Sequence, residues 1–163
     1  MDETTETYQN TGYSFDRIQR KSLVLDVEIS TDLTFDEKLQ EPLIIDKLSD
    51  IYLDNFGTYD AKINTLDPSE NISFLIGIDQ FNIKTSTNNA LFKDKISIPN
   101  EATVINTLKV HKGKKYNFIC TINPTTMRKL SGTITNIKTI PETIFNDSSG
   151  RFILELLIIS RDK

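Results

Sequence analysis

Short runs in which apolar and polar side chains alternate recur from Ser22 to the end of the chain, separated by turn residues. Alternation with a period of two places the apolar residues of a run on one face of a β-strand. In residues 23–29, for example, Leu23, Leu25 and Val27 share one face. The other runs cover residues 72–83, 91–98, 104–110, 116–122, 130–137 and 152–159. Several short strands at such spacing are typical of an all-β sandwich or barrel.

The amino-acid composition agrees with this pattern. The chain has 22 Ile and 19 Thr but only three Ala among its 163 residues. β-Branched side chains pack well on a pleated sheet, whereas Ala is the best helix former. The composition therefore favours sheets over helices.

One further element lies within residues 43–56, and its pattern fits two structures. Ile44, Leu48 and Ile51 would lie on one side of a helix. The later part of the segment, however, leads into an aromatic run with no helix stop signal other than Gly57. We predict a strand for this later part and leave the start of the segment open between helix and strand.

With this element, eight strands are predicted, and they fit two antiparallel sheets packed face to face. We predict a single jelly roll, although a lipocalin-like barrel or an immunoglobulin-like sandwich also accommodates eight short strands. In a jelly roll the first, third, sixth and eighth strands form one sheet. Here these four runs are the more apolar half, as expected if that sheet lies innermost in an assembly. Residues 112–114, Lys-Gly-Lys, predict a hairpin turn that pairs the fifth run with the sixth.

The amino-terminal segment differs from the rest of the chain. It is polar, with isolated Tyr8, Tyr13 and Phe15 and no sustained period. We predict a flexible arm over residues 1–21 and one jelly-roll domain over residues 22–163. The arm is either a terminus without fixed structure or a segment that orders by laying its aromatic side chains on a neighbouring subunit. Its acidic start lacks the basic and apolar regions of a signal peptide.

Few residues could support catalysis or hold a metal. His111 is the only histidine and Cys120 the only cysteine. A nucleophilic triad would depend on that one imidazole, and a zinc site would lack ligands. Cys120 alternates with apolar neighbours and is predicted to be a small core residue. We therefore expect no catalytic residue, no metal and no cofactor, and a protein that is not an enzyme.

Three aspartates, Asp46, Asp50 and Asp54, are spaced four residues apart. This spacing aligns them on one side of either a helix or a strand. A calcium site needs several oxygens that converge from a loop with a tight glycine turn, and the segment has no such signature. We predict a solvated strand edge whose charges block unwanted pairing.

Charge is distributed unevenly along the chain. Residues 1–60 hold 14 acidic and five basic residues, a balance of −9, whereas residues 61–163 hold nine acidic and 14 basic residues, a balance of +5. This asymmetry could favour head-to-tail contact between copies, or the fold could intermix the charges. Lys112, Lys114 and Lys115 form a basic cluster that could meet an acidic surface. The chain lacks the strong basic balance of a nucleic-acid-binding domain and any apolar run long enough to span a membrane.

Five segments resemble a group of viral proteins: residues 48–54 (LSDIYLD), 79–83 (DQFNI), 98–101 (IPNE), 111–124 (HKGKKYNFICTINP) and 151–153 (RFI). Together they resemble small virion-protein-like sequences from nucleocytoplasmic large DNA viruses. In these viruses, single jelly-roll proteins serve as pentons at capsid vertices or as minor capsid proteins. The resemblance implies a structural virion protein made in the host cytoplasm, and it implies no active-site residues.

From the resemblance we expect a homo-oligomer that also contacts other capsid proteins, with no specific nucleic acid and no membrane span. The expected assembly contacts are Tyr8, Tyr13, Phe15, Lys112, Lys114 and Lys115. The alternative is a carbohydrate- or ligand-binding β-sandwich module, since jelly rolls also host lectins. Its binding face would use Gln80, Asn82, Tyr116 and Asn117, but the chain has no Trp to form a sugar-stacking platform.

Overall fold

The residues that the structure describes form nine β-strands. The computed structural model describes residues 20–30, 32, 34–61, 73–83, 89–90, 92–99, 109–111 (backbone only), 117–136, 145 and 150–161. The strands are β1 (Arg20–Glu28), β2 (Thr34–Ile45), β3 (Ser49–Tyr59), β4 (Ser73–Ile78), β5 (Ile96–Pro99), β6 (Lys109–His111), β7 (Asn117–Ile122), β8 (Thr125–Thr135) and β9 (Arg151–Ser160). No residue in the described ranges is helical. These ranges accordingly contain no helix able to cross a membrane.

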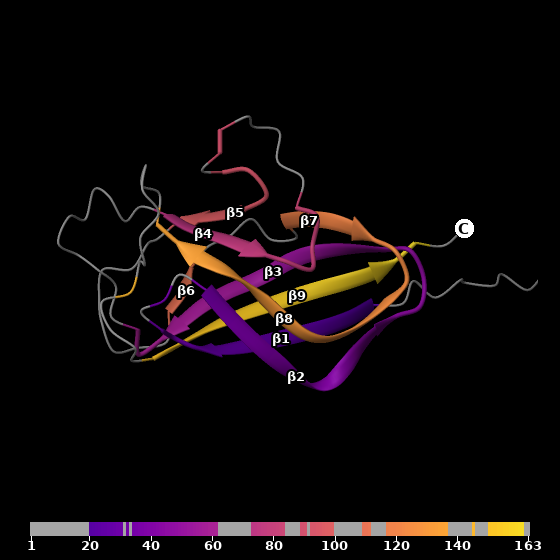
Figure 1. Ribbon diagram of the computed structural model, residues 1–163, viewed down its shortest axis with the longest axis horizontal. Helices are drawn as coiled ribbons and strands as arrows, with labels where there is room; N and C mark the ends of the chain where they lie inside the picture. The colour runs from indigo at the N-terminus through magenta and orange to yellow at the C-terminus, as the bar shows by residue number, and fades with distance from the viewer. Residues whose placement is uncertain are drawn as a thin grey trace, which may run out of the picture.

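The strands form two antiparallel sheets in separate layers (Figure 1). Sheet A has the order β1-β9-β3, and β6 and β7 lie one after the other along the remaining edge of β3. Sheet B has the order β2-β8-β4-β5. The nine strands therefore occupy eight positions, four in each sheet.

The order of these positions is that of a jelly roll. With β6 and β7 counted as one position, numbering along the chain gives 1-8-3-6 in sheet A and 2-7-4-5 in sheet B. The first, third, sixth and eighth positions thus make one sheet, and the predicted single jelly roll is confirmed. A lipocalin-like barrel would instead pair consecutive strands around a ring, whereas β1 and β2 lie in different sheets.

The eight predicted strands match the eight sheet positions because two errors compensate. β2 lies almost wholly before the segment that the sequence predicted as the second strand, while the runs of β6 and β7 were counted as two positions. As a consequence, the placement of residues 72–83 as the third strand of the apolar sheet is wrong. That run is β4 of sheet B, and β3 takes the place in sheet A. Residues 43–56 contain no helix, because β2 continues to Ile45 and β3 begins at Ser49.

The predicted pairing of the fifth run with the sixth is also wrong, while residues 112–114 themselves lie outside the described residues. Lys109–His111 pair with the end of β3, and Asn117–Ile122 pair with its beginning. Because both strands run antiparallel to β3, they follow each other in the same direction, whereas hairpin strands lie side by side in opposite directions. A glycine flanked by lysines signals a local turn, but pairing with the long edge of β3 decides the arrangement.

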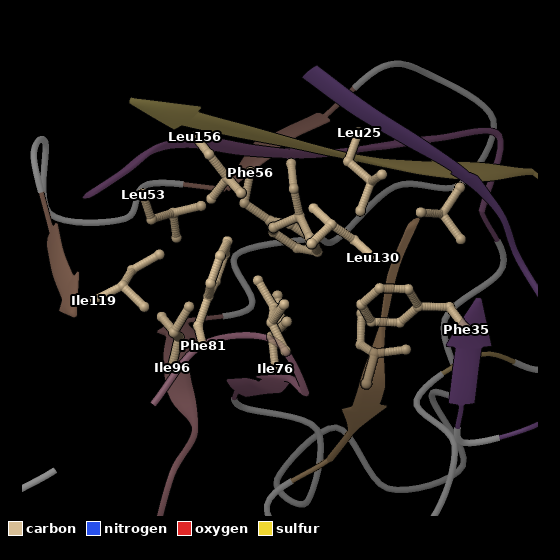
Figure 2. Packing of buried hydrophobic residues seen from close by; sticks show 14 of the residues in the cluster. Leu25, Phe35, Leu53, Phe56, Ile76, Phe81, Ile96, Ile119, Leu130 and Leu156 are labelled. Carbon is tan, nitrogen blue, oxygen red and sulfur yellow. The ribbon is translucent and has the colours of Figure 1, made fainter. Parts of the chain in front are cut away.

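Inward-facing side chains of both sheets form one hydrophobic core (Figure 2). Leu25 and Leu156 enter it from sheet A, and Ile76 and Leu130 enter it from sheet B. Cys120 is buried in the same core, as predicted. β9 alternates strictly between buried and half-buried residues, so one face of this apolar strand lies in the core and the other faces outward.

A cluster of aromatic rings joins the two sheets within this core. The rings of Phe56 in sheet A and Phe74 in sheet B meet edge to face, with their centroids 4.9 Å apart. Phe152 of sheet A meets Phe35 of sheet B in the same way at 5.5 Å, and Phe145 stacks on Phe152 at 6.4 Å. Aromatic pairs in these geometries add to the free energy that burial of their area supplies.

Candidate assembly surfaces

The chemical groups that the sequence singled out do not converge. Among the residues that the structure describes, no group of three His, Cys, Asp or Glu side chains could hold a metal ion. Burial, followed by the charge of Asp50, raises the pKa of the Cys120 thiol to about 11, so this thiol stays protonated and unreactive near neutral pH. His111 lies in β6, where the description covers the backbone alone.

The three aspartates do not form a common site. Asp46 lies between β2 and β3 and accepts a hydrogen bond from Nζ of Lys21 at 3.2 Å. Asp50 pairs with Arg161, and Asp54 is exposed where the register of β3 shifts against β9. The prediction that these charges protect a strand edge is wrong, because β3 is an interior strand of sheet A.

All six residues predicted as assembly contacts lie outside the described part of the chain: Tyr8, Tyr13, Phe15, Lys112, Lys114 and Lys115. Their role stays a prediction. The described chain begins at Arg20, the first residue of β1, two residues before the predicted start of the domain.

The outer face of sheet A carries an apolar row across β9, β3 and β7, next to Ser22 of β1. Ser22, Leu157, Tyr52 and Phe118 are cross-strand neighbours in that order. The Tyr52 and Phe118 rings meet edge to face with their centroids 5.6 Å apart, and Phe118 is 47% exposed. Leu157 and Tyr52 in this row are half-buried. Adjacent apolar side chains that stay partly exposed mark interaction sites more often than isolated apolar residues do. The sequence already indicates this outer apolar surface, because residues 152–159 are apolar on both faces.

Charged groups lie beside this apolar row at one end of the sheet. Nη2 and Nε of Arg161 contact the Asp50 carboxylate at 2.7 and 2.8 Å, and the Thr121 hydroxyl donates to the same carboxylate at 2.7 Å. The hydrogen bond from Arg161 is the largest cause that lowers the pKa of Asp50. This network ties β3, β7 and the residue after β9 together.

At the other end of sheet A, one arginine faces two carboxylates. Nε of Arg151 lies 2.6 Å from Asp26, and its Nη1 lies 3.2 Å from Glu28. The Glu28 side chain is 79% exposed. One positive and two negative charges leave this end of β1 with an excess negative charge that a cation from outside could neutralise.

A groove of about 520 Å³ lies between β1 and β2. Residues 23–26 line it from β1 and residues 37–41 from β2. Because consecutive residues of β1 contribute, the groove runs along the edge of this strand and not along one of its faces. Burial, followed by the nearby charge of Glu28, raises the pKa of Glu37 in this groove, while the charge of Arg151 acts in the opposite direction.

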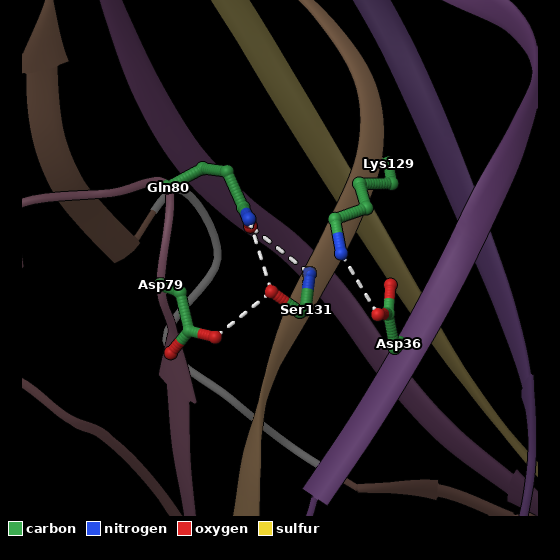
Figure 3. Close-up of polar contacts among 5 residues, drawn as sticks. All are labelled: Asp36, Asp79, Gln80, Lys129 and Ser131. Carbon is green, nitrogen blue, oxygen red and sulfur yellow. Dashed lines mark hydrogen bonds and ion pairs between the residues drawn. The ribbon is translucent and has the colours of Figure 1, made fainter.

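A second hollow, polar in its lining, lies beside β4 and contains two of the residues predicted for carbohydrate binding, Gln80 and Asn82. Figure 3 shows that the Gln80 amide is already engaged: its oxygen accepts from the backbone N–H of Ser131 and its nitrogen donates to the Ser131 hydroxyl, both at 3.0 Å. The same hydroxyl donates to Asp79 at 2.8 Å. Phe81 is buried, so it offers no open ring for stacking.

The other two predicted carbohydrate-binding residues do not join this hollow in the described structure. Asn117 lies on β7 of sheet A, and Tyr116 lies outside the described residues. On the neighbouring surface of sheet B, Lys129 and Asp36 form an exposed ion pair at 2.8 Å that links β8 to β2 (Figure 3).

Comparison with known proteins adds no relative to this description. The chain matches no protein-family model, no curated protein and no solved structure. Its function must therefore be inferred from its own surfaces.

Proposed function

We propose that this chain is a structural building block of a virion, a penton or minor capsid subunit that assembles with copies of itself and with neighbouring capsid proteins. The observation that supports it best is the apolar row on the outer face of a jelly-roll sheet, with Phe118 47% exposed at one end. An outward apolar face of this extent is expected of a surface that a neighbour covers. The resemblance of five sequence segments to virion proteins points in the same direction.

In this role the sandwich acts as a wedge whose core sets its shape and whose faces meet neighbours. The aromatic cluster holds the two sheets together, so contacts on the outer face of sheet A would be transmitted to the whole domain. The segment before β1 would tie adjacent subunits through Tyr8, Tyr13 and Phe15. The lysines between β6 and β7 would meet acidic surface on a neighbour.

Two measurements test this proposal. Size-exclusion chromatography with light scattering is expected to show an oligomer, and mass spectrometry of purified virions from the source of the chain is expected to detect the protein in stoichiometric amount. Phe118→Ser, which removes an exposed ring and leaves the core intact, is expected to weaken assembly. A strict monomer that is absent from virions would contradict the proposal.

A carbohydrate- or ligand-binding module is the second candidate, and the hollow that contains Gln80 and Asn82 is the feature that favours it. Binding would require amide groups that can turn toward a ligand, whereas Gln80 is bonded to Ser131 at both ends. A glycan array separates the two candidates. Hits that disappear with Asn82→Ala would favour the binding module, and an array without hits would remove it.

A further inference from the structure

The two sheets present four edge positions, and three of them carry features that hinder pairing with another strand. The register of β2 is broken between Lys38 and Leu43, and this break contains Pro42. β5 has only four residues and ends at Pro99. The β6–β7 position is made of two short strands, of three and six residues. Breaks, prolines and short strands are the devices by which proteins prevent edge-to-edge association.

β1 has none of these devices. Its nine residues pair with β9 in one unbroken register, and the strand contains neither Pro nor Gly. No described strand pairs with its other edge. A groove separates residues 23–26 from residues 37–41 of β2, and Val24, at the middle of the strand, is 57% exposed. β1 is thus a long, regular strand edge that is open to another chain.

The charges of β1 fit a second copy of the same strand. When two copies run antiparallel with Val24 opposite Val24, Arg20 of each copy lies opposite Glu28 of the other, and Ser22 lies opposite Asp26. No like charges stand directly opposite each other in this register. On the inward side, Leu23 lies opposite Leu25. Cross-strand pairs of opposite charge and of apolar side chains stabilise a sheet, and opposed like charges destabilise it.

We propose that two copies of this protein associate about a two-fold axis at Val24, so that β1 pairs with β1 and sheet A continues across the dimer. The excess negative charge at Glu28, which shares Arg151 with Asp26, then meets Arg20 of the second copy. The contact does not depend on the virion role. It is isologous, as most homodimer contacts are.

The size of this contact suits a specific dimer. A nine-residue strand is about 30 Å long, and two sheets about 10 Å apart with their side chains make a side wall about 20 Å high. Pairing along this wall covers about 600 Å² on each copy, or about 1,200 Å² in total, which lies at the lower limit of specific interfaces.

Charge reversal tests the pairing. Arg20→Glu and Glu28→Arg each replace two attractive contacts by two repulsive ones, and each is expected to raise the dimer dissociation constant about tenfold or more. An equal mixture of the two variants is expected to form a mixed dimer with wild-type affinity, because both contacts are attractive again. Within one copy the two residues are about 26 Å apart, so this recovery cannot arise inside a monomer.

Analytical ultracentrifugation and native mass spectrometry provide the measurement, with circular dichroism to establish that each variant is folded. Lys93→Glu is the matched control, since it makes the same kind of charge reversal at an exposed residue beside β5, the far edge of sheet B, and is expected to leave the β1 dimer intact. A wild-type monomer at the highest soluble concentration would overturn the inference. So would single variants that associate as well as wild type, or a mixture that does not recover.

Cysteine cross-linking tests the register separately. Val24→Cys places two thiols opposite each other, and mild oxidation is expected to join the copies by a disulfide. Ser22→Cys is the control, because in this register it faces Asp26 and its two copies are about 13 Å apart. Buried Cys120 gives a low background. Equal cross-linking of both variants, or of neither, would overturn the register.

Discussion

The charge of Asp50 stabilises the cluster that this side chain forms with Arg161 and Thr121. The Arg161 guanidinium holds its pKa below the ordinary value of 3.8, so the folded state favours the ionised carboxylate. A lowered pKa stabilises the fold above pH 3.8, and this contribution is lost as the pH falls through the lower pKa of the folded state. The stabilisation is therefore complete at neutral pH and absent in strong acid.

Asp50→Asn is expected to lower the free energy of unfolding at neutral pH by about 1–2 kcal/mol, because it weakens charge-assisted hydrogen bonds to Arg161 and Thr121. The difference from wild type should shrink as the pH falls below 3.8. Urea denaturation from neutral pH to about pH 2 measures it. Asp54→Asn on the same strand is the control, and this exposed residue should change stability by less than about 0.5 kcal/mol at any pH. A constant difference for Asp50→Asn across the range would contradict the assignment.

Among the strands, β9 and β2 are held face to face by aromatic rings. Phe152 of β9 is 1% exposed and contacts rings from β2, β3 and Phe145. Phe152→Ala is expected to lower the free energy of unfolding by about 3–5 kcal/mol, because it leaves a cavity between the sheets. Phe118→Ala makes the same chemical change at an exposed position and should cost less than about 1 kcal/mol. Thermal and urea unfolding of both variants give the comparison, and equal losses would contradict this account of the core.

The sequence predicts strands well where alternation buries one face. It predicts them poorly where the position of a strand depends on which neighbours it pairs with. β1, β7 and β9 follow directly from their apolar periods. β2 was missed because its middle, residues 36–42, is mostly charged and polar and contains Pro42, so its burial is interrupted. Which strands become neighbours depends on tertiary packing, and this explains why the predicted pairing of the fifth run with the sixth is wrong. Val24 is visible as an outward residue in the sequence, but only the topology shows that β1 is an edge.

For the whole molecule, the distribution of open and blocked edges limits the size of an assembly built by strand pairing. A sandwich with two open edges would add copies without end and form fibres. In the part of the chain that the structure describes, β1 is the edge without a break, a proline or a short length. Two-fold pairing uses this edge on both copies at once, so association through strands stops at two. Larger assemblies would then have to use other surfaces, such as the apolar outer face of sheet A.

A dimer closed in this way should couple folding to concentration. Because unfolding releases two chains, the melting temperature of a dimer rises with protein concentration. A tenfold increase adds about 1.4 kcal/mol per dimer, which corresponds to about 2 °C for a domain of this size. Differential scanning calorimetry over a hundredfold concentration range is therefore expected to show a rise of about 4 °C for wild type. Arg20→Glu, which weakens the dimer about tenfold or more, is expected to melt about 2 °C or more below wild type at each concentration at which wild type is a dimer. Equal melting temperatures of the two proteins would show that the copies are held together by a surface other than β1.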